Sequence, residues 1–515
     1  MLNNDGKRSL ISLSIVLVAA LGLRLFHLQD RVLWFDEAGS LLVARAGPAE
    51  IIDAVHDDIH SPFYFLILHY WQLLGQSEAV ARLLSVLAGV ATVAAVWKLG
   101  RVLLGRGAGL AGAVFLAICP LHVWYSQEIK MYAVQTLLVT LSFLFMVLAL
   151  RQQGKTLWIG YCAFTALSLY AQYASVYAIV AQNIFVTLYY WRDRQKIRVW
   201  LISQGVVGLL FAPWVPVFLS QARSVLGSSW MGPFEFGRVL AFFSLLSGAY
   251  LGDPHPRAIS EAITILGLLL PTAILVRAHE SRQQGVMLVL WFVVPVVLLM
   301  CQSLNYNRFL PRALLYTTPP FALLLGCASC PAGTARPSRK QFAPTGGTAP
   351  QPGKKAIRVV GMLAAFAVLT ANFYALGNYY FSENPWVKSD LRIAADKLSR
   401  ELQPGDVVLH LSESSLRPFQ CYLGIGAVQG VIDLPVYQPH LFRVIGDGRL
   451  PKSSDGYKRI WLVLYPDQFH RDLAETARDW MNRHHHFVKA LHESSTVFVG
   501  LYDRQDAQLA PAVTR

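Results

Sequence analysis

The sequence predicts a polytopic α-helical membrane protein with a small α/β domain at its C-terminal end. Of its 515 residues, 54% are hydrophobic and only 15% are charged, whereas soluble domains carry about 25% charged residues. Apolar runs near the length that crosses a bilayer, roughly 20 residues, recur up to residue 377. From residue 385 onward the charge density rises, and short helix-like and strand-like patterns alternate. These features exclude a soluble enzyme, a disordered chain and a secreted disulfide scaffold.

The excess of basic residues indicates how the chain crosses the membrane. Lys and Arg number 45 against 31 Asp and Glu, which gives a net charge of +14. Basic residues of membrane proteins gather in cytoplasmic loops, so we expect no nucleic-acid partner. The first apolar run, 10–28, follows Lys7 and Arg8. It is too long for a signal-peptide core and lacks a small-residue cleavage site, so a retained helix that enters from the cytoplasm is expected.

About eleven transmembrane helices are expected. The aromatic-rich segment 62–75 is not among them, because about 14 residues suit an interfacial helix better than a span. Counting it as a span would also place nearly all of the basic loops outside. The expected spans are 10–28, 79–97, 107–125, 131–150, 156–172, 174–191, 199–219, 258–277, 285–301, 312–328 and 358–377.

This topology divides the chain into four parts. They are a transmembrane catalytic module over 1–328, a flexible basic cytoplasmic linker over 329–357, a last transmembrane helix over 358–377, and an extracytoplasmic α/β domain over 378–515. In the last part we expect helices over 389–402 and 469–484, and strands over 407–411, 459–464 and 496–502. The consecutive residues His484, His485 and His486 are interpreted as a solvated helix end rather than as metal ligands.

Ionisable residues gather in the loops that are expected on the outer face. The first outer loop carries Asp36 and Glu37, then Asp58 and His60, and the second carries Glu128. Bundling of the first and third membrane helices would bring Asp36 and Glu128 together. Charged groups near a membrane core are costly and usually functional. Two carboxylates at one interfacial site suit general-base catalysis and divalent-cation binding equally well, and solvated helix caps are the structural alternative.

Four segments carry a resemblance to a known family. They read WFDEAGSLLVARA, DIHSPFYFLILHYW, ARLLSVLAGV and CPLHVWYSQEIKMYAV. They resemble bacterial polyprenyl-phosphate-sugar glycosyltransferases of the GT-C fold, a group that includes family 39, the protein O-mannosyltransferases, and the aminoarabinose transferases of lipid A. The resemblance is dense over 25–145, looser over 309–326 and weak over 402–410. Its most specific piece is W-Y-S-Q-E-x-[RK]-M-Y.

The resemblance implies roles for the outer residues. It implies that the Asp of the first-loop Asp-Glu pair, here Asp36, is the base, and that the second-loop acid, Glu128, helps to orient the acceptor or a cation. The residues that it implies for donor phosphate binding are His60, Lys130, Arg308 and Arg312. A divalent metal cation is the one cofactor considered, with Asp58 and His60 as its ligands. The residues expected to support the site are Glu37, Tyr125, Gln127 and Tyr132.

Two positions depart from the family pattern. Ser61 stands where the family often has a first Pro, and Lys130 stands where it usually has Arg. Lysine keeps the positive charge but loses the bidentate fork of arginine, so a phosphate contact there would be less directional. For each of the three cations Lys130, Arg308 and Arg312, snorkelling to the membrane interface is the alternative.

The expected function is transfer of a hexose or pentose from a polyprenyl-phosphate-linked donor to a hydroxyl group of a glycan, lipid or protein acceptor. We expect an inverting displacement at the outer, periplasmic face of a bacterial cytoplasmic (inner) membrane, among membrane lipids. A transporter or lipid flippase is the main alternative, and a structural polytopic subunit is another. Transporters tend to show internal repeats and ionisable residues near the middle of the membrane. No repeat is visible in the hydropathy of this chain, and its acidic residues lie at helix ends.

Overall fold

The fold is described by a computed structural model. It describes residues 4–56, 58–225, 233–247, 257–277, 282–305, 308–329, 353–381, 390–423, 428–431, 458–465 and 473–504. The chain forms two compact units. The first contains residues 1–28, 55–67 and 79–382, and the second contains 29–54, 68–78 and 383–515.

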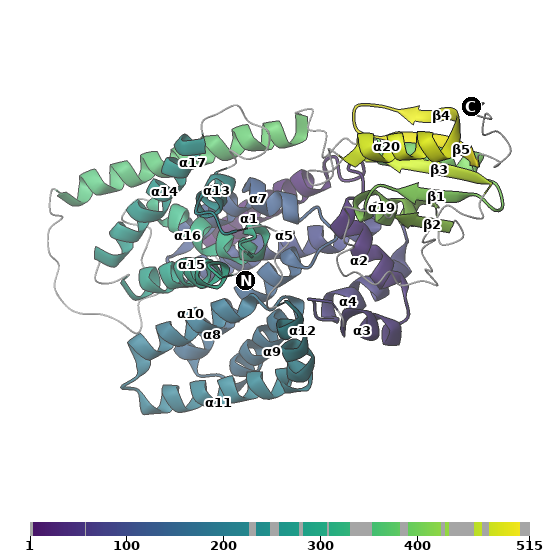
Figure 1. Cartoon of the computed structure of the whole chain (residues 1–515). Coiled ribbons are helices and arrows are strands. Elements are labelled where there is room, and N and C mark those ends of the chain that lie inside the picture. The colour runs from purple at the N-terminus through teal and green to yellow at the C-terminus, as the bar shows by residue number, and fades with distance from the viewer. Residues whose placement is uncertain are drawn as a thin grey trace, which may run out of the picture. The chain divides into compact units, whose positions relative to one another are not determined.

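The first unit is made of helices (Figure 1). Their bounds are α1 Asn4–Leu25, α4 Phe63–Trp71, α5 Glu78–Leu103, α6 Arg106–Ala117, α7 Pro120–Tyr125, α8 Tyr132–Gln152, α9 Lys155–Ala171, α10 Ser175–Tyr190, α11 Arg194–Phe211, α12 Val215–Val225, α13 Gly237–Leu246, α14 Arg257–Arg277, α15 Arg282–Ser303, α16 Thr318–Ala328 and α17 Gly353–Phe381. Short 3₁₀ turns precede α12 (Ala212–Trp214, η2) and α16 (Pro311–Thr317, η3). Residues 68–71 of α4 and the first residue of α5 belong to the second unit.

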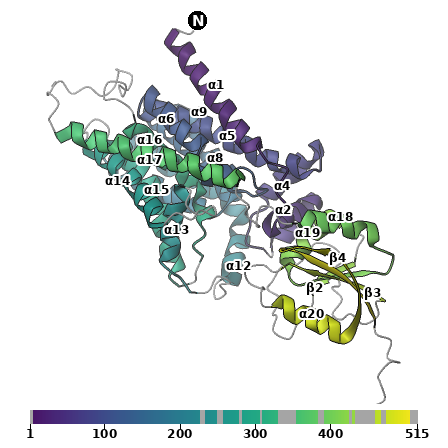
Figure 2. The same ribbon diagram turned by 90° about the horizontal axis from the view of Figure 1, so that it is seen from above.

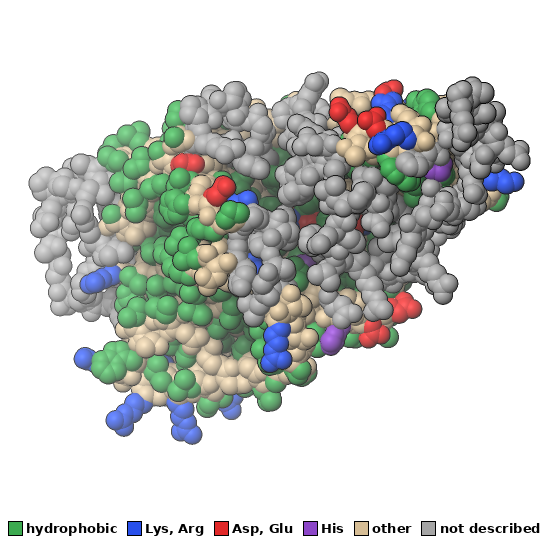
Figure 3. Space-filling view, viewed as in Figure 1, with side chains coloured by type: hydrophobic (Ala, Val, Ile, Leu, Met, Phe, Trp, Pro, Cys, Tyr) green, Lys and Arg blue, Asp and Glu red, His purple; other side chains and the backbone are tan. Residues whose placement is uncertain are grey.

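Six helical stretches in the described part of the chain are long and apolar enough to cross a membrane. Each of the eleven expected spans coincides with a helix or with a pair of shorter ones. The span expected over 107–125 is broken, because α6 ends at Ala117 and Pro120 begins α7. Proline has no backbone N–H and favours the first turn of a helix, so it ends one helix and starts the next. Hydrophobic side chains cover much of the surface of the first unit, as Figure 3 shows.

The membrane-type helices pack through small and uncharged polar residues. A Cβ atom on Gly326 of α16 would lie 2.5 Å from the carbonyl oxygen of Ala108 in α6, so these helices can approach closely only with glycine there. Ser142 of α8 forms hydrogen bonds with Thr165 of α9 (2.7 Å) and Gln182 of α10 (2.9 Å). Such bonds join apolar helices without burying a charge.

The second unit contains a five-stranded sheet of order β2-β1-β3-β5-β4. The strands are β1 Val407–His410, β2 Val428–Val431, β3 Arg459–Leu464, β4 His485–Glu493 and β5 Phe498–Arg504, and its helices are α2 Phe35–Arg45, α3 Pro48–His56, α18 Leu391–Glu401, α19 Glu413–Leu423 and α20 Leu473–His484. β1 pairs in parallel with β2 and β3, and β5 pairs antiparallel with β3 and β4.

Helices cover both faces of this sheet (Figure 2). Leu409 and Leu462 face α20, where they pack with Ala477 and Met481. The alternate residues of the same strands pack with Leu398 of α18 and with Phe419 of α19. The consecutive apolar residues of β1 and β3 therefore bury both faces, as in other parallel strands.

The C-terminal elements agree in part with the sequence prediction. The strand over Arg459–Leu464 has the expected bounds, and α18, β1, α20 and β5 lie within a few residues of theirs. The histidine run is a correction: α20 ends at His484, but His485 is buried and begins strand β4. Residues 330–352 of the expected linker lie outside the described residues, and α17 begins at Gly353, five residues before the expected span.

Candidate active site

The segment that joins α7 to α8 holds a buried carboxylate in a fixed orientation. Pro120 starts α7, which ends at Tyr125, and turns carry the chain to the start of α8 at Tyr132. Glu128 in these turns is only 3% exposed, and the indole N–H of Trp124 donates a hydrogen bond of 2.6 Å to its Oε1. A charge-assisted bond of this kind is stronger than one between neutral groups.

The side chain of Gln127 ties this segment to two helices. The side-chain amide of Gln127 donates to the carbonyl oxygens of Arg24 and Phe26 at the end of α1, each at 2.9 Å. Its Oε1 accepts a bond of 2.6 Å from the hydroxyl of Tyr379 in α17. Gln127 therefore joins the ends of α1 and α17 to the segment before α8, and its expected role in supporting a site stays a prediction.

A second polar group lies in the loop between α3 and α4. His60 Nδ1 and Asp58 Oδ2 are 2.9 Å apart, and the N–H of Ile59 donates to Asp58 Oδ1 at 2.7 Å. Burial raises the pKa of Asp58, but His60, the Ile59 N–H and the charge of Lys130 together hold this pKa well below its usual range. Asp58 is therefore ionised, and Lys130 lies within its electrostatic reach.

Three residues that the sequence did not single out hold this loop in place. The side-chain amide of Gln221 in α12 donates to the carbonyl oxygens of Val55 (2.6 Å) and His60 (3.1 Å). Its Oε1 accepts a bond of 2.7 Å from the hydroxyl of Tyr173, which in turn accepts the indole N–H of Trp214 at 2.7 Å. The hydroxyl of Ser61 donates to the carbonyl oxygen of Tyr170, so this residue anchors the loop where the family often has proline.

Two expected phosphate-binding cations lie near the starts of α8 and α10. The guanidinium carbon of Arg312 lies 5.9 Å from the ring centre of Tyr132, the first residue of α8. The ring of Tyr132 also meets that of Tyr125 edge to face at 5.5 Å. Arg308 lies within electrostatic reach of the Tyr177 hydroxyl in α10. Lys130 and Arg312 thus both approach the N-terminus of α8, where the helix dipole favours an anion.

The expected base belongs to the second unit. Asp36 and Glu37 lie in the first turn of α2, where the carboxylates complement the helix dipole, and Glu37 is buried. The hydroxyl of Ser40 donates to the backbone carbonyl of Asp36 at 2.9 Å. Glu128 and His60 belong to the first unit, so the pairing of Asp36 with Glu128 stays a prediction.

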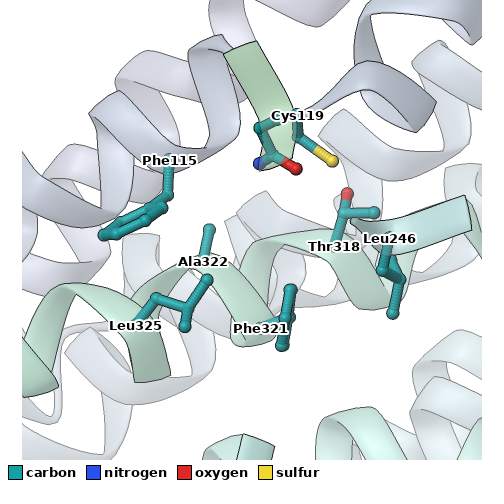
Figure 4. A pocket seen from close by; sticks show the side chains of 8 residues that line it. Phe115, Cys119, Leu246, Thr318, Phe321, Ala322 and Leu325 are labelled. Carbon is teal, nitrogen blue, oxygen red and sulfur yellow. The ribbon is translucent and has the colours of Figure 1, made fainter. Parts of the chain in front are cut away.

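Two further features bear on where chemistry occurs. Among the described residues, no group of three or more His, Cys, Asp and Glu side chains could hold a metal ion. A small pocket in the first unit is lined mostly by apolar side chains (Figure 4). Its lining residues are Phe115, Cys119, Leu246, Thr318, Phe321, Ala322, Leu325 and Asn372. None of them is a carboxylate or a cation, so the ionisable groups of the candidate site lie elsewhere.

Comparison with known proteins identifies the fold. The model of the dolichyl-phosphate-mannose-protein mannosyltransferase family matches residues 59–217, a range that includes His60, Glu128 and Lys130. No curated protein matches the sequence. The apo structure of ArnT from Cupriavidus metallidurans is 12% identical, with a TM-score of 0.62 over 97% of this chain and 98% of ArnT.

Two further solved structures are similar. ArnT from the same organism bound to undecaprenyl phosphate is 12% identical, with a TM-score of 0.60 over 96% of this chain and 97% of that one. The oligosaccharyltransferase AglB from Archaeoglobus fulgidus, in complex with an inhibitory peptide and a dolichol-phosphate, is 12% identical, with a TM-score of 0.53 over 98% of this chain and 75% of AglB. The chain has the GT-C fold with a small C-terminal sheet, which confirms the predicted fold class.

Proposed function

We propose that this GT-C chain is a membrane glycosyltransferase that moves a sugar from a polyprenyl-phosphate donor to an acceptor hydroxyl group. The observation that carries the proposal is the segment before α8, where buried Glu128 is fixed by Trp124 and buried Lys130 lies within electrostatic reach of Asp58. The similarity to a polyprenyl-phosphate-binding enzyme supports this class of donor. The same comparisons do not favour a transporter or flippase.

In the proposed reaction, Lys130, Arg312 and His60 bind the donor phosphate near the N-terminus of α8. The acceptor oxygen attacks the anomeric carbon as its proton passes to Asp36. The bond between the anomeric carbon and the phosphate oxygen breaks, and the polyprenyl phosphate leaves with the bonding electrons. Since the leaving group is already an anion of low basicity, it needs stabilisation by positive charge rather than protonation. Direct displacement inverts the anomeric configuration.

The test is turnover by the purified chain in lipid nanodiscs. A panel of polyprenyl-phosphate hexoses and pentoses is supplied with glycan, lipid and peptide acceptors, and release of polyprenyl phosphate is measured. Asp36→Asn should lower kcat by about 10²- to 10⁴-fold, the usual contribution of a general base. The Asp36→Asn variant should still bind undecaprenyl phosphate. The matched control is Asp53→Asn, which makes the same change on the exposed face of α3.

Near-normal turnover by Asp36→Asn would remove Asp36 from the mechanism. A product that keeps the anomeric configuration of the donor would favour a covalent glycosyl-Asp intermediate and two displacements. Release of polyprenyl phosphate from no member of the panel would count against the proposed function itself. We place the reaction at the outer face of a bacterial cytoplasmic membrane.

The proposed reaction does not require a divalent cation at Asp58 and His60. Two protein ligands would hold such an ion only together with oxygen atoms of the donor phosphate. Asp58 already accepts bonds from His60 and from Ile59, so we expect turnover to persist in excess EDTA, with Lys130 and the arginines supplying the positive charge. Loss of turnover in EDTA that Mg²⁺ or Mn²⁺ restores would establish the cation instead.

A further inference from the structure

Helix α2, which carries Asp36, packs against helix α19 of the C-terminal α/β domain. The two segments are separated by more than 350 positions in the sequence and lie in the same compact unit. α19 is in turn fixed to the sheet, because Phe419 and the partly buried Tyr422 pack on residues of β1 and β3. α2 is therefore attached to a folded domain.

Arg417 of α19 makes the central contact. Its guanidinium carbon lies 4.3 Å from the ring centre of Phe35, and its Nη2 donates to Glu413 Oε2 at 3.0 Å. A Cβ atom added at Gly39 would lie 2.7 Å from Arg417 Nη1. Phe35 and Gly39 are one helical turn apart, so the guanidinium lies against one face of α2 at the turn that contains Asp36.

Other contacts fix the chain at the start of α2. The N–H of Leu33 donates to the hydroxyl of Tyr422 at 2.9 Å, and the thiol of Cys421 contacts the carbonyl oxygen of Ala38 at 3.6 Å. Arg392 of α18 donates to the carbonyl oxygens of Gln29 and Arg31, each at 3.0 Å. The contacts thus occur both before and after Asp36, on residues 29, 31, 33, 35, 38 and 39.

We propose that the C-terminal domain is a positioning device for the catalytic base, with Arg417 as its main positioning residue. This inference rests on the proposed function, in which Asp36 takes the acceptor proton. Arg417 acts through the backbone of α2, because a side chain attached to a helix moves with the turn that carries it. A displacement of about 1 Å at a reacting group can cost a factor of 10² in rate, so loosening α2 should lower kcat without altering how the donor phosphate is bound.

The experiment uses the full chain in nanodiscs and three variants. Arg417→Met removes the charged guanidinium group from the ring of Phe35. Gly39→Ala tests the contact from the other side: alanine favours a helix more than glycine does, but its Cβ displaces the guanidinium. Arg400→Met is the matched control, because Arg400 lies on the exposed face of α18. Tyr422→Phe, which removes one hydroxyl group, replaces Arg417→Met if that variant does not fold.

Two readouts separate positioning from general stability. Hydrogen exchange of peptides that cover residues 33–45 should rise at least fivefold in Arg417→Met and Gly39→Ala. With the donor that the wild-type chain uses, kcat should fall about 10- to 100-fold, while the donor KM and the affinity for undecaprenyl phosphate stay within twofold. Arg400→Met should change none of these quantities.

The outcomes distinguish this inference from the proposed function. Unchanged exchange of α2 in both variants would overturn the coupling, whatever the turnover. Raised exchange with normal kcat, in a chain that Asp36→Asn inactivates, would overturn positioning and leave the proposed function intact. Near-normal turnover by Asp36→Asn would overturn the role of the base and its positioning, but the exchange data would still show whether α19 holds α2.

Discussion

The indole N–H of Trp124 orients one oxygen of the buried Glu128 carboxylate. A hydrogen bond to a charged group contributes about 1.5–3 kcal/mol, and each 1.4 kcal/mol corresponds to about tenfold in rate. If Glu128 orients the acceptor, Trp124→Phe should lower kcat by roughly 10- to 100-fold. The measurement is steady-state release of polyprenyl phosphate in nanodiscs.

The control for this substitution is Trp97→Phe. The indole nitrogen of Trp97 is also buried, and it has no hydrogen-bond partner among the described residues, so the variant removes an equal volume and no bond. Its kcat should stay within twofold of wild type. An equal loss in both variants would mean that ring volume matters, and normal kcat in Trp124→Phe would leave the hydrogen bond without a catalytic role.

Some of the residues in and around the candidate site are predictable from the sequence, and others are not. The sequence singles out Asp58, Glu128 and Lys130 as candidate site residues, because charged side chains beside apolar runs are costly and usually functional. Gln221 could not, because its bonds to Val55 and His60 join residues separated by 166 and 161 positions. A lone glutamine in an apolar helix has no periodicity that indicates its partner.

Between helices, the close approach of α5 to the segment before α8 depends on Gly89. A Cβ atom there would lie 2.3 Å from Ser126 Oγ and 2.8 Å from Ser126 Cβ. Gly89→Ala should therefore lower the melting temperature, because overpacking typically costs about 1–3 kcal/mol and outweighs the gain of up to about 1 kcal/mol in helix propensity.

Gly208 of α11 offers the matched comparison for Gly89. In the described part of the chain, no atom outside the neighbouring backbone of α11 lies within 4 Å of a Cβ atom at Gly208, so Gly208→Ala should keep or raise the melting temperature. Thermal unfolding in the same detergent measures both variants. A melting temperature of Gly89→Ala equal to that of Gly208→Ala would contradict the close approach.

The pairing of β1 with its neighbours includes a buried titratable group, His410. Its Nδ1 lies 3.1 Å from Ser415 Oγ and its Nε2 lies 3.3 Å from Gln429 Oε1. Burial lowers its pKa to about 3, against a smaller opposing effect of Gln429. The unfolded chain therefore binds a proton at pH values where the folded chain does not, and stability is lost as the pH falls from about 6.5 towards about 3.

Calorimetry of the full chain can test this linkage. Between pH 7.5 and pH 5 the wild-type C-terminal domain should lose up to about 2 kcal/mol of unfolding free energy from this one group. His410→Gln cannot titrate, so its loss over the same range should be smaller by that amount. The same acid sensitivity in both proteins would exclude His410 as the source.

The elements of the C-terminal domain were predictable where the sequence shows one clear pattern, either a short apolar run or a helical period of apolar residues. β1 and β3 are short runs of β-branched and other apolar residues. The apolar residues of α18 recur with the period of a helix, so that this helix is strongly amphipathic. α19 was missed because it contains Pro418 and has two serines after its first residue, and these residue types are typical of turns. β4 was missed because its mostly exposed residues at the sheet edge show no alternation; pairing with β5 defines it instead.

On the scale of the whole molecule, the division into two units differs from the division that hydropathy suggests. Hydropathy separates membrane helices from a C-terminal domain and leaves 29–78 as a loop. In the structure, residues 29–54 and 68–78 belong with residues 383–515, because polar contacts such as the 2.7 Å ion pair of Arg392 with Glu78 join them. No local sequence pattern predicts such long-range contacts. The membrane spans, in contrast, are predictable because each depends only on the length of one continuous apolar run.

The membrane topology is the prediction that tests the whole molecule. The short apolar stretch 63–74 is 12 residues long, or about 18 Å as a helix, against about 30 Å of bilayer core. If it does not cross, the loops that contain Arg151, Lys155 and Arg194 lie in the cytoplasm and the C-terminal domain lies outside. If it crosses, every later loop changes side and the positive charges lie outside, against the usual bias of membrane insertion.

Single cysteines placed in a variant without the six native cysteines distinguish these two topologies. Gln153 is the exposed C-cap of α8, and Ser399 is exposed on α18, so a cysteine at either position can react. In intact cells with a permeable outer envelope, a membrane-impermeant maleimide should label Ser399→Cys and should label Gln153→Cys only after the membrane is opened. The reverse order would mean that 63–74 crosses the membrane. Glu128 and the C-terminal domain would then face the cytoplasm, whereas Asp58, which precedes this stretch, would stay outside. The outer leaflet would thus be removed as the place of the proposed reaction.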